Sequence, residues 1–394
     1  MRQEQFAEAV GVSVEAVKKW ERRGATITLS PPYAARMDRK LQEAGVDVAE
    51  RFWSILEIQD TAKVSTRPAA MLESGALGMA TEGALASRPL VAAFADSGVD
   101  HVRHFLDKRM TIIESDNIYG SAVTLPDVLG SIARMLALRK AKVVESRPVL
   151  RLLAMYAETA AWQFQDQRDF ASAQHWAEKA LTWSHQIGDT YCIGLSLVRM
   201  SQLACDMGDF ESGRELAEQA RRTAPPDSLF AAAAVTFGAH AAALDGDRSG
   251  SAHAYDAART LVARATTDPA WGFFLDHSYI DAHHAHTLAE LGRHATAAQQ
   301  FADAIARMQA GYPRERGVYL ARAAVAYMAA GEIEPAARLG RQALAIGTVT
   351  GSGRIMNKVI TLAGMIDPAS RLPGVGEFVE EFETWKDTRC LDPM

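Results

Sequence analysis

The sequence predicts an all-α protein in which a short N-terminal helical module precedes a long array of helix pairs. Three observations carry this prediction. Turn signals recur at nearly regular intervals along the C-terminal two thirds, and small residues stand at fixed distances from those signals. The third observation is that the first 24 residues have the pattern of two helices joined by a glycine turn.

The turn signals combine glycine or aspartate with the first residue of a new helix. They are Asp169-Phe170, Gly208-Asp209-Phe210, Gly246-Asp247-Arg248, Gly292-Arg293-His294 and Gly331-Glu332-Ile333. Each indicates the end of one helix and the start of the next. Their last residues, which we call the turn slot, lie 40, 38, 46 and 39 residues apart. This spacing is typical of an α-solenoid.

Small residues occupy three positions relative to the turn slot. Three residues after it stand Ala173, Gly213, Ser251, Ala297 and Ala336. Ten after it stand Ala180, Ala220, Ala258, Ala304 and Ala343, and nine before it stand Ala161, Ser201, Ala239, Ala285 and Ala324. Antiparallel helices that pack closely need such residues, with Trp176, Tyr255 and Phe301 supplying the bulk between them. Chance periodicity in an alanine-rich chain is the alternative.

This pattern resembles the tetratricopeptide repeat (TPR), whose turn carries Gly-Asp-aromatic and whose second helix carries alanine at these offsets. The resemblance covers residues 147–348, with helices or connections longer than the family's standard 34 residues allow. Pro225, Pro226, Pro269 and Pro313 fall between predicted pairs, as helix-ending prolines should. Residues 353–366 and 376–386 then supply a terminal capping pair.

The N-terminal residues 3–24, QEQFAEAVGVSVEAVKKWERRG, place Gly11 at a tight turn and Ser13 at a helix start. They closely resemble the Cro/C1-type (XRE) helix-turn-helix. The resemblance implies that the second helix reads DNA, with Val14, Glu15 and Lys18 as base readers. Phosphate contacts are then expected from Gln3, Lys19, Arg22 and Arg23.

Two features of this module leave an alternative open. Phe6, Ala7, Val12, Val17 and Trp20 form a core whether the module reads DNA or is a small helical cap with surface charges. A complete domain of this class also has a helix before the one holding Gln3, whereas the chain starts at Met1. We therefore expect either a start that lies further upstream or a degenerate module.

The organisation expected from these patterns has three parts. Residues 1–58 form the helix-turn-helix module, residues 59–145 a linker and helical connector, and residues 146–386 the TPR-like array. Within the connector, residues 61–89 lack amphipathic rhythm, and residues 91–113 and 125–144 are amphipathic helical stretches. A turn is expected at residues 115–120 between these two helices.

Composition narrows the function classes. The formal net charge is −6, so affinity for DNA must come from a local basic patch. The three cysteines, at positions 192, 205 and 390, have no metal-ligand spacing and fit a reducing compartment. A polar N-terminus without an apolar core predicts a cytoplasmic protein with no membrane partner. No catalytic motif occurs, so neither an enzyme nor a cofactor is expected.

One histidine-rich stretch raises the question of a metal. His277, Asp281 and His284 fall at i, i+4 and i+7, one helical face that could hold zinc. The alternative, which we prefer, is a polar stripe on an exposed or groove-lining helix, because no residue can be named that would orient the ligands.

In the TPR family the first helix of each pair lines a concave groove. Eight residues before the turn slot stand Trp162, Gln202, His240, His286 and Val325. Nearby positions of the same surface hold Glu158, Gln165, Asp166, Asp206 and Glu290. The resemblance thus implies a polar, acid-leaning groove with one aromatic wall, suited to a peptide with positive charge. Solvated turn residues are the alternative reading of these acids.

A Cro/C1-type module joined to a TPR array resembles bacterial regulators of the RRNPP type, in which a ligand in the groove alters DNA binding. The resemblance implies promoter DNA, a peptide, small ligand or protein in the groove, and a homodimer. The alternative is a TPR scaffold with a degenerate helix-turn-helix that does not bind DNA.

Overall fold

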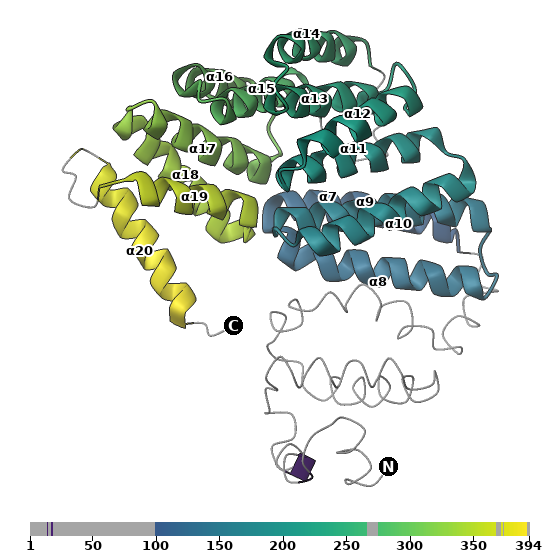
Figure 1. Cartoon of the computed structure of the whole chain (residues 1–394). Helices are drawn as coiled ribbons and strands as arrows, with labels where there is room; N and C mark the ends of the chain where they lie inside the picture. Colours follow the sequence, from purple (N-terminus) through teal and green to yellow (C-terminus); the bar gives the residue numbers. More distant parts are fainter. Residues whose placement is uncertain are drawn as a thin grey trace. The chain divides into compact units, whose positions relative to one another are not determined.

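The computed structural model describes residues 99–265, 275–367, 372 and 374–391, together with Val14, Val17 and Lys18. The chain divides into two units, Met1–Met71 and Leu72–Met394, and the array lies in the second. Every element in the described part of that second unit is an α-helix (Figure 1). The all-α prediction is therefore confirmed.

Two helices, α7 (His101–Tyr119) and α8 (Ser121–Lys140), precede the helix pairs. Each of the five predicted turns then joins two helices. The pairs are α9 (Ser146–Asp166) with α10 (Phe170–Ile187), α11 (Thr190–Asp206) with α12 (Phe210–Thr223), α13 (Leu229–Leu244) with α14 (Arg248–Arg264), α15 (His277–Glu290) with α16 (His294–Arg307), and α17 (Pro313–Ala329) with α18 (Ile333–Thr350). The expected terminal pair is α19 (Gly353–Met365) and α20 (Val375–Leu391).

The five turns repeat one backbone geometry. The residue two before the turn slot has a positive φ, which is 84° at Gly208 and 107° at Gly246, for example. In the first turn this position holds Arg168, at φ 66°. The next residue donates its N–H to the carbonyl five residues earlier, as Asp209 does to Ala204 at 2.9 Å. This is the Schellman arrangement, which gives the orphan carbonyls of a helix end a donor.

Aspartate then starts the second helix in three of these turns. The side chain of Asp169 accepts from the Ser172 N–H, that of Asp209 from Ser212, and that of Asp247 from Gly250. Each cap satisfies one of the free N–H groups of a helix start. The Gly-Asp pairs in the sequence thus encode a helix stop and a helix start in adjacent residues.

All fifteen small positions of the predicted register are buried, at 3% exposure or less where a value is given. At one of these positions the hydroxyl of Ser201 donates to the Gly213 carbonyl at 2.7 Å. The two helices of that pair are therefore close enough for a short side chain of one to reach the backbone of the other. A Cβ on Gly213 would lie 2.7 Å from Cys205 Sγ, closer than real Cβ contacts. Trp176, Tyr255 and Phe301 are buried between the helices. The predicted packing register is confirmed.

The helices before the array differ from the expected pattern. Helix α7 continues through the residues expected to form a turn, and Gly120, at φ 87°, makes the connection to α8. The reason is that Asp116 is a buried helical residue, whose carboxylate accepts from the hydroxyls of Ser121 and Thr124. Helix α8 therefore starts four residues earlier than expected, at Ser121, and Pro126 falls in its second turn.

Among the described residues, α8 is the one helix that is long and apolar enough to cross a membrane by length and composition. It packs on α9, and its apolar side chains Leu125, Val128, Ile132 and Met135 lie in the core at 2% exposure or less. Core helices of this kind meet the same criterion as membrane spans.

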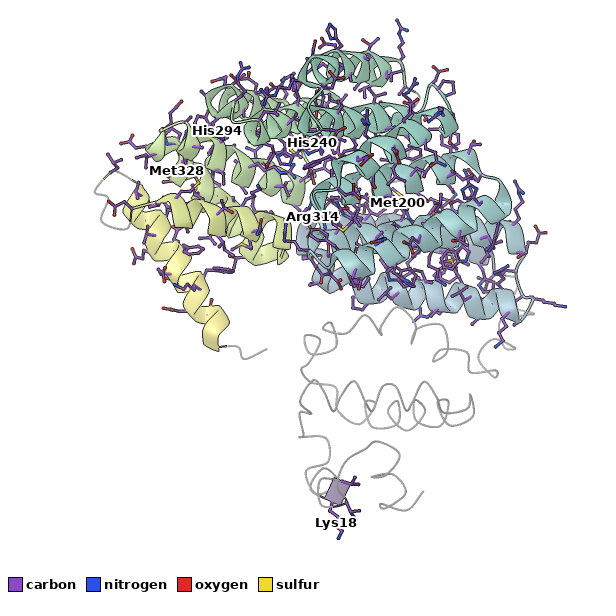
Figure 2. All side chains as sticks on the ribbon, viewed as in Figure 1. Lys18, Met200, His240, His294, Arg314 and Met328 are labelled. Atoms are coloured by element: carbon purple, nitrogen blue, oxygen red, sulfur yellow. The ribbon has the colours of Figure 1, made fainter. Side chains whose placement is uncertain are left out.

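The apolar core falls into two clusters that divide within α15. One contains residues from Phe105 to Ile280, and the other contains residues from Ala282 to Phe378. The array also folds back onto the helix that precedes it, because α17 and α18 of its fifth pair contact α7 (Figure 1). We refer below to α7 with the first pairs, and to α17–α19, as the two ends of the array. Arg314, at the start of α17, lies where these two parts of the array meet (Figure 2). Polar side chains fill this junction.

The register can be tested by overpacking it. Ala258 on α14 is fully buried, whereas its neighbour Ala257 is exposed. We expect Ala258→Phe to destabilise the array by about 1–3 kcal/mol, because the larger ring forces the helices apart. Thermal melting measures the effect, with Ala257→Phe as the matched control. Equal melting temperatures for both variants would show that Ala258 is not at a helix contact.

Candidate functional site

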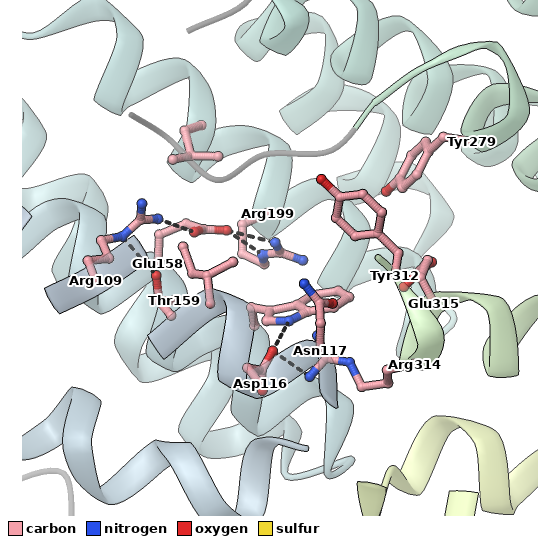
Figure 3. A pocket seen from close by; sticks show the side chains of 13 residues that line it. Arg109, Asp116, Asn117, Glu158, Thr159, Arg199, Tyr279, Tyr312, Arg314 and Glu315 are labelled. Carbon is pink, nitrogen blue, oxygen red and sulfur yellow. Dashed lines mark hydrogen bonds and ion pairs between the residues drawn. The ribbon is translucent and has the colours of Figure 1, made fainter. Parts of the chain in front are cut away.

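A pocket lies at the junction between the two ends of the array (Figure 3). Its walls come from α7, α9 and α11 on one side and from α15, α17 and Tyr312 on the other. The free volume is about 100 Å³. The lining residues are Arg109, Ile113, Asp116, Asn117, Glu158, Thr159, Trp162, Leu195, Arg199, Tyr279, Tyr312, Arg314 and Glu315.

Trp162 is the centre of this junction. Three guanidinium groups lie over its ring, with the central carbon of Arg354 at 4.2 Å, of Arg199 at 4.7 Å and of Arg314 at 5.1 Å from the ring centre. The indole N–H donates to Asp116 Oδ2 at 3.4 Å. The electron-rich ring faces attract cations, most strongly where water is excluded. One ring thereby joins helices α9, α11, α17 and α19.

Glu158 neutralises two of the pocket's arginines. Its Oε1 accepts from Arg199 Nε at 3.0 Å and Nη2 at 2.7 Å, and its Oε2 lies 3.7 Å from Arg109 Nη2. Figure 3 shows Arg109 and Arg199 on either side of this carboxylate. Arg109 also donates to Thr159 Oγ1 at 3.1 Å. Burial lowers the pKa of Arg109, and the charge of Glu158 opposes that effect.

Asp166 and Arg354 form a buried ion pair between the first and last parts of the array. Arg354 Nε donates to Asp166 Oδ1 at 2.9 Å, and the Ser352 hydroxyl donates to the same oxygen at 2.9 Å. Burial would raise the pKa of Asp166, but Arg314 and Arg354 outweigh it and hold the pKa below its usual value. Burial would likewise lower the pKa of Arg354, yet Glu315 and Asp166 hold it above its ordinary value.

Arg314 makes the second ion pair of the junction and retains one free donor. Its Nη1 contacts Asp116 Oδ2 at 2.5 Å and donates to the Ser121 hydroxyl at 2.9 Å. The residue is 2% exposed, and its buried Nε has no hydrogen-bond partner in the described part of the chain. A buried N–H without an acceptor costs free energy, so a ligand acceptor here would be favoured.

Two glycines allow the backbones of the junction to approach. A Cβ on Gly120 would lie 1.7 Å from the Thr350 carbonyl oxygen, and one on Gly353 would lie 3.0 Å from the carbonyl oxygens of Asp166 and Gln167. No larger residue fits the first position without moving α18 away from α7.

The predicted groove residues fall into two groups in the structure. Gln165, Gln202 and Asp206 join Glu158 and Trp162 around Arg199, whose Nη1 donates to Gln165 at 3.0 Å and to Gln202 at 2.5 Å. Gln165 in turn donates to Asp206 at 2.6 Å. His240, His286 and Glu290 form a second group, in which the two imidazole rings stack with centres 5.0 Å apart.

The expected acid-leaning charge of the groove needs correction. Glu158 and Asp166 are buried and already paired with arginines, so neither carboxylate is available to a positively charged ligand. Because Arg109, Arg199 and Arg314 line the pocket beside Asp116, Glu158 and Glu315, its formal charges balance. Glu158 and Asp166 could be recognised in the sequence, but the arginine that pairs with Asp166 lies 188 residues further along the chain.

The arginines are the residues of the junction that sequence reasoning missed. Arg199 offered a signal, because it stands three residues before Gln202 and therefore on the same face of a helix. Arg109, Arg314 and Arg354 offered none, since the first lies outside the predicted array and the others are close to helix starts. Only the return of the array onto α7 brings them together.

The histidine-rich stretch of α15 is engaged by arginines. Asp281 accepts from Arg259 at 2.8 Å and from Arg307 at 2.8 Å, and His284 Nδ1 lies 3.2 Å from Arg259 Nη2. The described residues contain no cluster of histidine, cysteine or acid that could hold a metal. Burial lowers the pKa of His240 to about 4, so its ring is neutral near pH 7.

Two of the seven expected DNA contacts lie among the described residues. Val14 and Lys18 are both helical, with Val14 half-buried and Lys18 exposed, and the neighbouring Val17 is buried at 3% exposure as its core position predicts. Gln3, Glu15, Lys19, Arg22 and Arg23 lie outside the described residues.

No protein-family model matches this chain, and no curated protein is similar enough to count as a relative. The geometry of the pocket and the sequence patterns therefore carry the functional argument.

The buried pair between Asp166 and Arg354 predicts a large effect of one substitution. Asp166→Asn should destabilise the array by about 3–5 kcal/mol, because it leaves buried arginines without their carboxylate. Chemical denaturation measures this loss. Asp245→Asn is the control, since it removes an exposed ion pair with Arg214, which should contribute about 1 kcal/mol or less.

The same pair sets the pH dependence of that effect. Because the pKa of Asp166 is lowered in the folded protein, its contribution to stability is complete above the pKa of the unfolded chain. It is lost as the pH falls through the folded-state pKa. The difference between parent and Asp166→Asn should thus be constant from pH 8 to about pH 5 and shrink in more acid solution. A constant difference at every pH would contradict this assignment.

Proposed function

We propose that the protein is a DNA-binding regulator of transcription whose array of TPR-like helix pairs binds a ligand that modulates its activity. The observation that carries the proposal is the pocket around Trp162, built where the two ends of the array meet. It is joined in one chain to residues 3–24, which resemble a Cro/C1-type helix-turn-helix. A recognition unit and a sensing unit are the parts that such a regulator needs.

The chemistry of the pocket favours a ligand with peptide-like groups. Trp162, Tyr279 and Tyr312 provide aromatic surface, and the Asn117 amide can both donate and accept. The buried Arg314 N–H needs an acceptor, such as a carbonyl oxygen. With a free volume of about 100 Å³, the pocket suits one side chain or one terminus of a longer ligand.

The position of the pocket suggests how binding is transmitted. A ligand there contacts α7, α9 and α11 together with α17, so its binding energy depends on how closely these parts approach. Any ligand that binds one arrangement more tightly shifts the array towards it. The helix-turn-helix unit would then respond to the geometry of the array.

A scaffold that binds a partner and no DNA is the second candidate. The net charge of −6 favours it, because the overall field repels phosphate. Direct measurement of DNA binding separates the two functions.

For DNA binding, we expect Lys18→Ala with Lys19→Ala to weaken affinity and flatten its salt dependence. Lys19 is the expected phosphate contact and Lys18 brings a second positive charge to the DNA, so losing both reduces counterion release. The slope of log K against log salt should fall by about 0.9 for each phosphate that is no longer neutralised. The measurement uses the full chain and duplexes that it selects from a random pool. Lys140→Ala with Lys386→Ala removes the same charge from exposed sites of α8 and α20 and serves as the control.

An unchanged slope in the Lys18/Lys19 variant, with binding intact, would remove both lysines from the DNA contact. If no duplex is enriched by the parent, the scaffold is the better description.

For the pocket, we expect Asn117→Trp to block ligands by filling it. Ligands are first found by thermal shift of the full chain against a panel of short synthetic peptides and free amino acids. Those ligands should lose affinity by about tenfold or more in Asn117→Trp, since an indole added to a small pocket displaces them. Glu114→Trp places the same ring on an exposed position of α7 and should leave binding unchanged. Equal affinity for both variants would exclude this pocket.

A further inference from the structure

Two consecutive residues at the start of α17, Arg314 and Glu315, bring unmet hydrogen-bonding groups of opposite kinds to the pocket around Trp162. Both side chains line the pocket (Figure 3). Arg314 is 2% exposed and Glu315 is 8% exposed. Buried polar groups are almost always hydrogen-bonded, so the partners that these two side chains lack indicate what a ligand would supply.

Arg314 lacks acceptors on one edge of its guanidinium. Its hydrogen bond to the Ser121 hydroxyl and its closest contact with Asp116 both use Nη1. The buried Nε has no hydrogen-bond partner among the described residues. In a guanidinium, Nε and one terminal nitrogen donate in parallel, which is the geometry that binds both oxygens of a carboxylate. The Nε edge of Arg314 therefore favours a carboxylate as its partner.

Glu315 lacks donors. In the described part of the chain its hydrogen bond comes from Arg354 Nη2, which lies 3.3 Å from Glu315 Oε2. This distance is long for a bond between two charged groups, and Arg354 makes its shorter bond, of 2.9 Å, to Asp166. A carboxylate has about four lone-pair sites, so Glu315 can accept further hydrogen bonds. An ammonium group would supply both the donors and the opposite charge.

Charge and size narrow the class of ligand. Three arginines and three acids line the pocket, so a ligand with one unbalanced charge would disturb the balance, whereas a zwitterion would not. The free volume is about 100 Å³. A cavity of ~150 Å³ holds benzene, so the pocket suits a ligand of about six non-hydrogen atoms. Among ligands of this size, a free amino acid carries both charges, whereas a peptide separates its charged termini.

We propose that the pocket binds a small free amino acid as its zwitterion, with the α-carboxylate on Arg314 and the α-ammonium on Glu315. Both contacts come from the first turn of α17, and Asn117 of α7 and Trp162 of α9 line the same pocket. The amino acid would therefore bind where the two ends of the array meet. This inference rests on the proposed ligand-binding role of the pocket and names the class of its ligand.

Four probes built on one three-carbon frame test the proposal. L-alanine carries both charges, propionate only the carboxylate, alaninamide only the ammonium, and propionamide neither. At about pH 6.5 the α-amino groups are protonated. Isothermal titration of the full chain should give L-alanine an affinity at least tenfold higher than that of each other probe. Because this comparison uses the parent protein, it does not depend on the folding of any variant.

Two substitutions assign the charges to their residues. Glu315→Gln keeps the size of the side chain and removes its charge, so it should reduce the preference for L-alanine over propionate by tenfold or more. Arg314→Lys keeps the charge and removes the Nε edge, so it should reduce the preference for L-alanine over alaninamide to a similar extent. Each preference compares two ligands on one protein, so a general loss of stability would not change it. Glu334→Gln and Arg338→Lys, at exposed sites of α18, are the controls.

The proposal is overturned if L-alanine binds no better than the other three probes, or if Glu315→Gln and Arg314→Lys keep the preferences of the parent. A preference for propionamide would show that the pocket binds a neutral amide instead. These outcomes are distinct from a failure of the proposed function. Peptides that bind and are blocked by Asn117→Trp, without affinity for L-alanine, would leave that function standing without this specificity. L-alanine binding in a protein that enriches no DNA would place the amino-acid site on a scaffold.

Discussion

The arrangement of the array depends on charged side chains that are buried where its two ends meet. The apolar core is divided into two clusters, and the pairs Asp116–Arg314 and Asp166–Arg354 connect the helices of one to those of the other. Buried ion pairs add little net stability, because desolvation cancels most of their attraction. Any other alignment of α7 and α17 would leave these charges buried and unpaired. They therefore select one curvature of the array.

The pocket is a consequence of this way of joining the two ends. Three guanidiniums share the faces of Trp162, and their repulsion is balanced by carboxylates at the edges. Groups with fixed hydrogen-bond directions cannot fill space as alkyl side chains do, so a polar void stays beside them. In the described part of the chain, the Arg314 Nε–H likewise has no acceptor placed where it could accept a hydrogen bond. A ligand that supplies acceptors can complete a network that the protein leaves incomplete.

Local patterns predicted most of the fold, whereas the site was predicted only in part. Gly208-Asp209 encodes a turn and a cap within two residues, and Ala258 or Gly213 reports a helix contact by its size alone. Each of these signals involves residues of a single helix pair, so it can be recognised in a short stretch of sequence. A turn was wrongly predicted at Ser115–Gly120, because residues such as Asp116 are common in turns. Here the Asp116 carboxylate is instead bound by Ser121 and Arg314, and the residue lies in a buried helix. Trp162 followed from the register, but Arg314 and Arg354 reach it only through closure of the array, which no local pattern encodes.

The number of helices that a ligand contacts decides how far it can shift the array. Moving an equilibrium from mostly open to mostly closed requires a preference of about 5.5 kcal/mol for one state. A single charge-assisted hydrogen bond contributes about 1.5–3 kcal/mol, so contact with Arg314 alone is insufficient. The pocket is lined by Asn117 of α7, Trp162 of α9 and Arg314 of α17, so a ligand in it can contact three helices at once. These contacts add only when the helices lie together. A ligand of the pocket would thus gain its preference for that arrangement from the number of helices that it contacts.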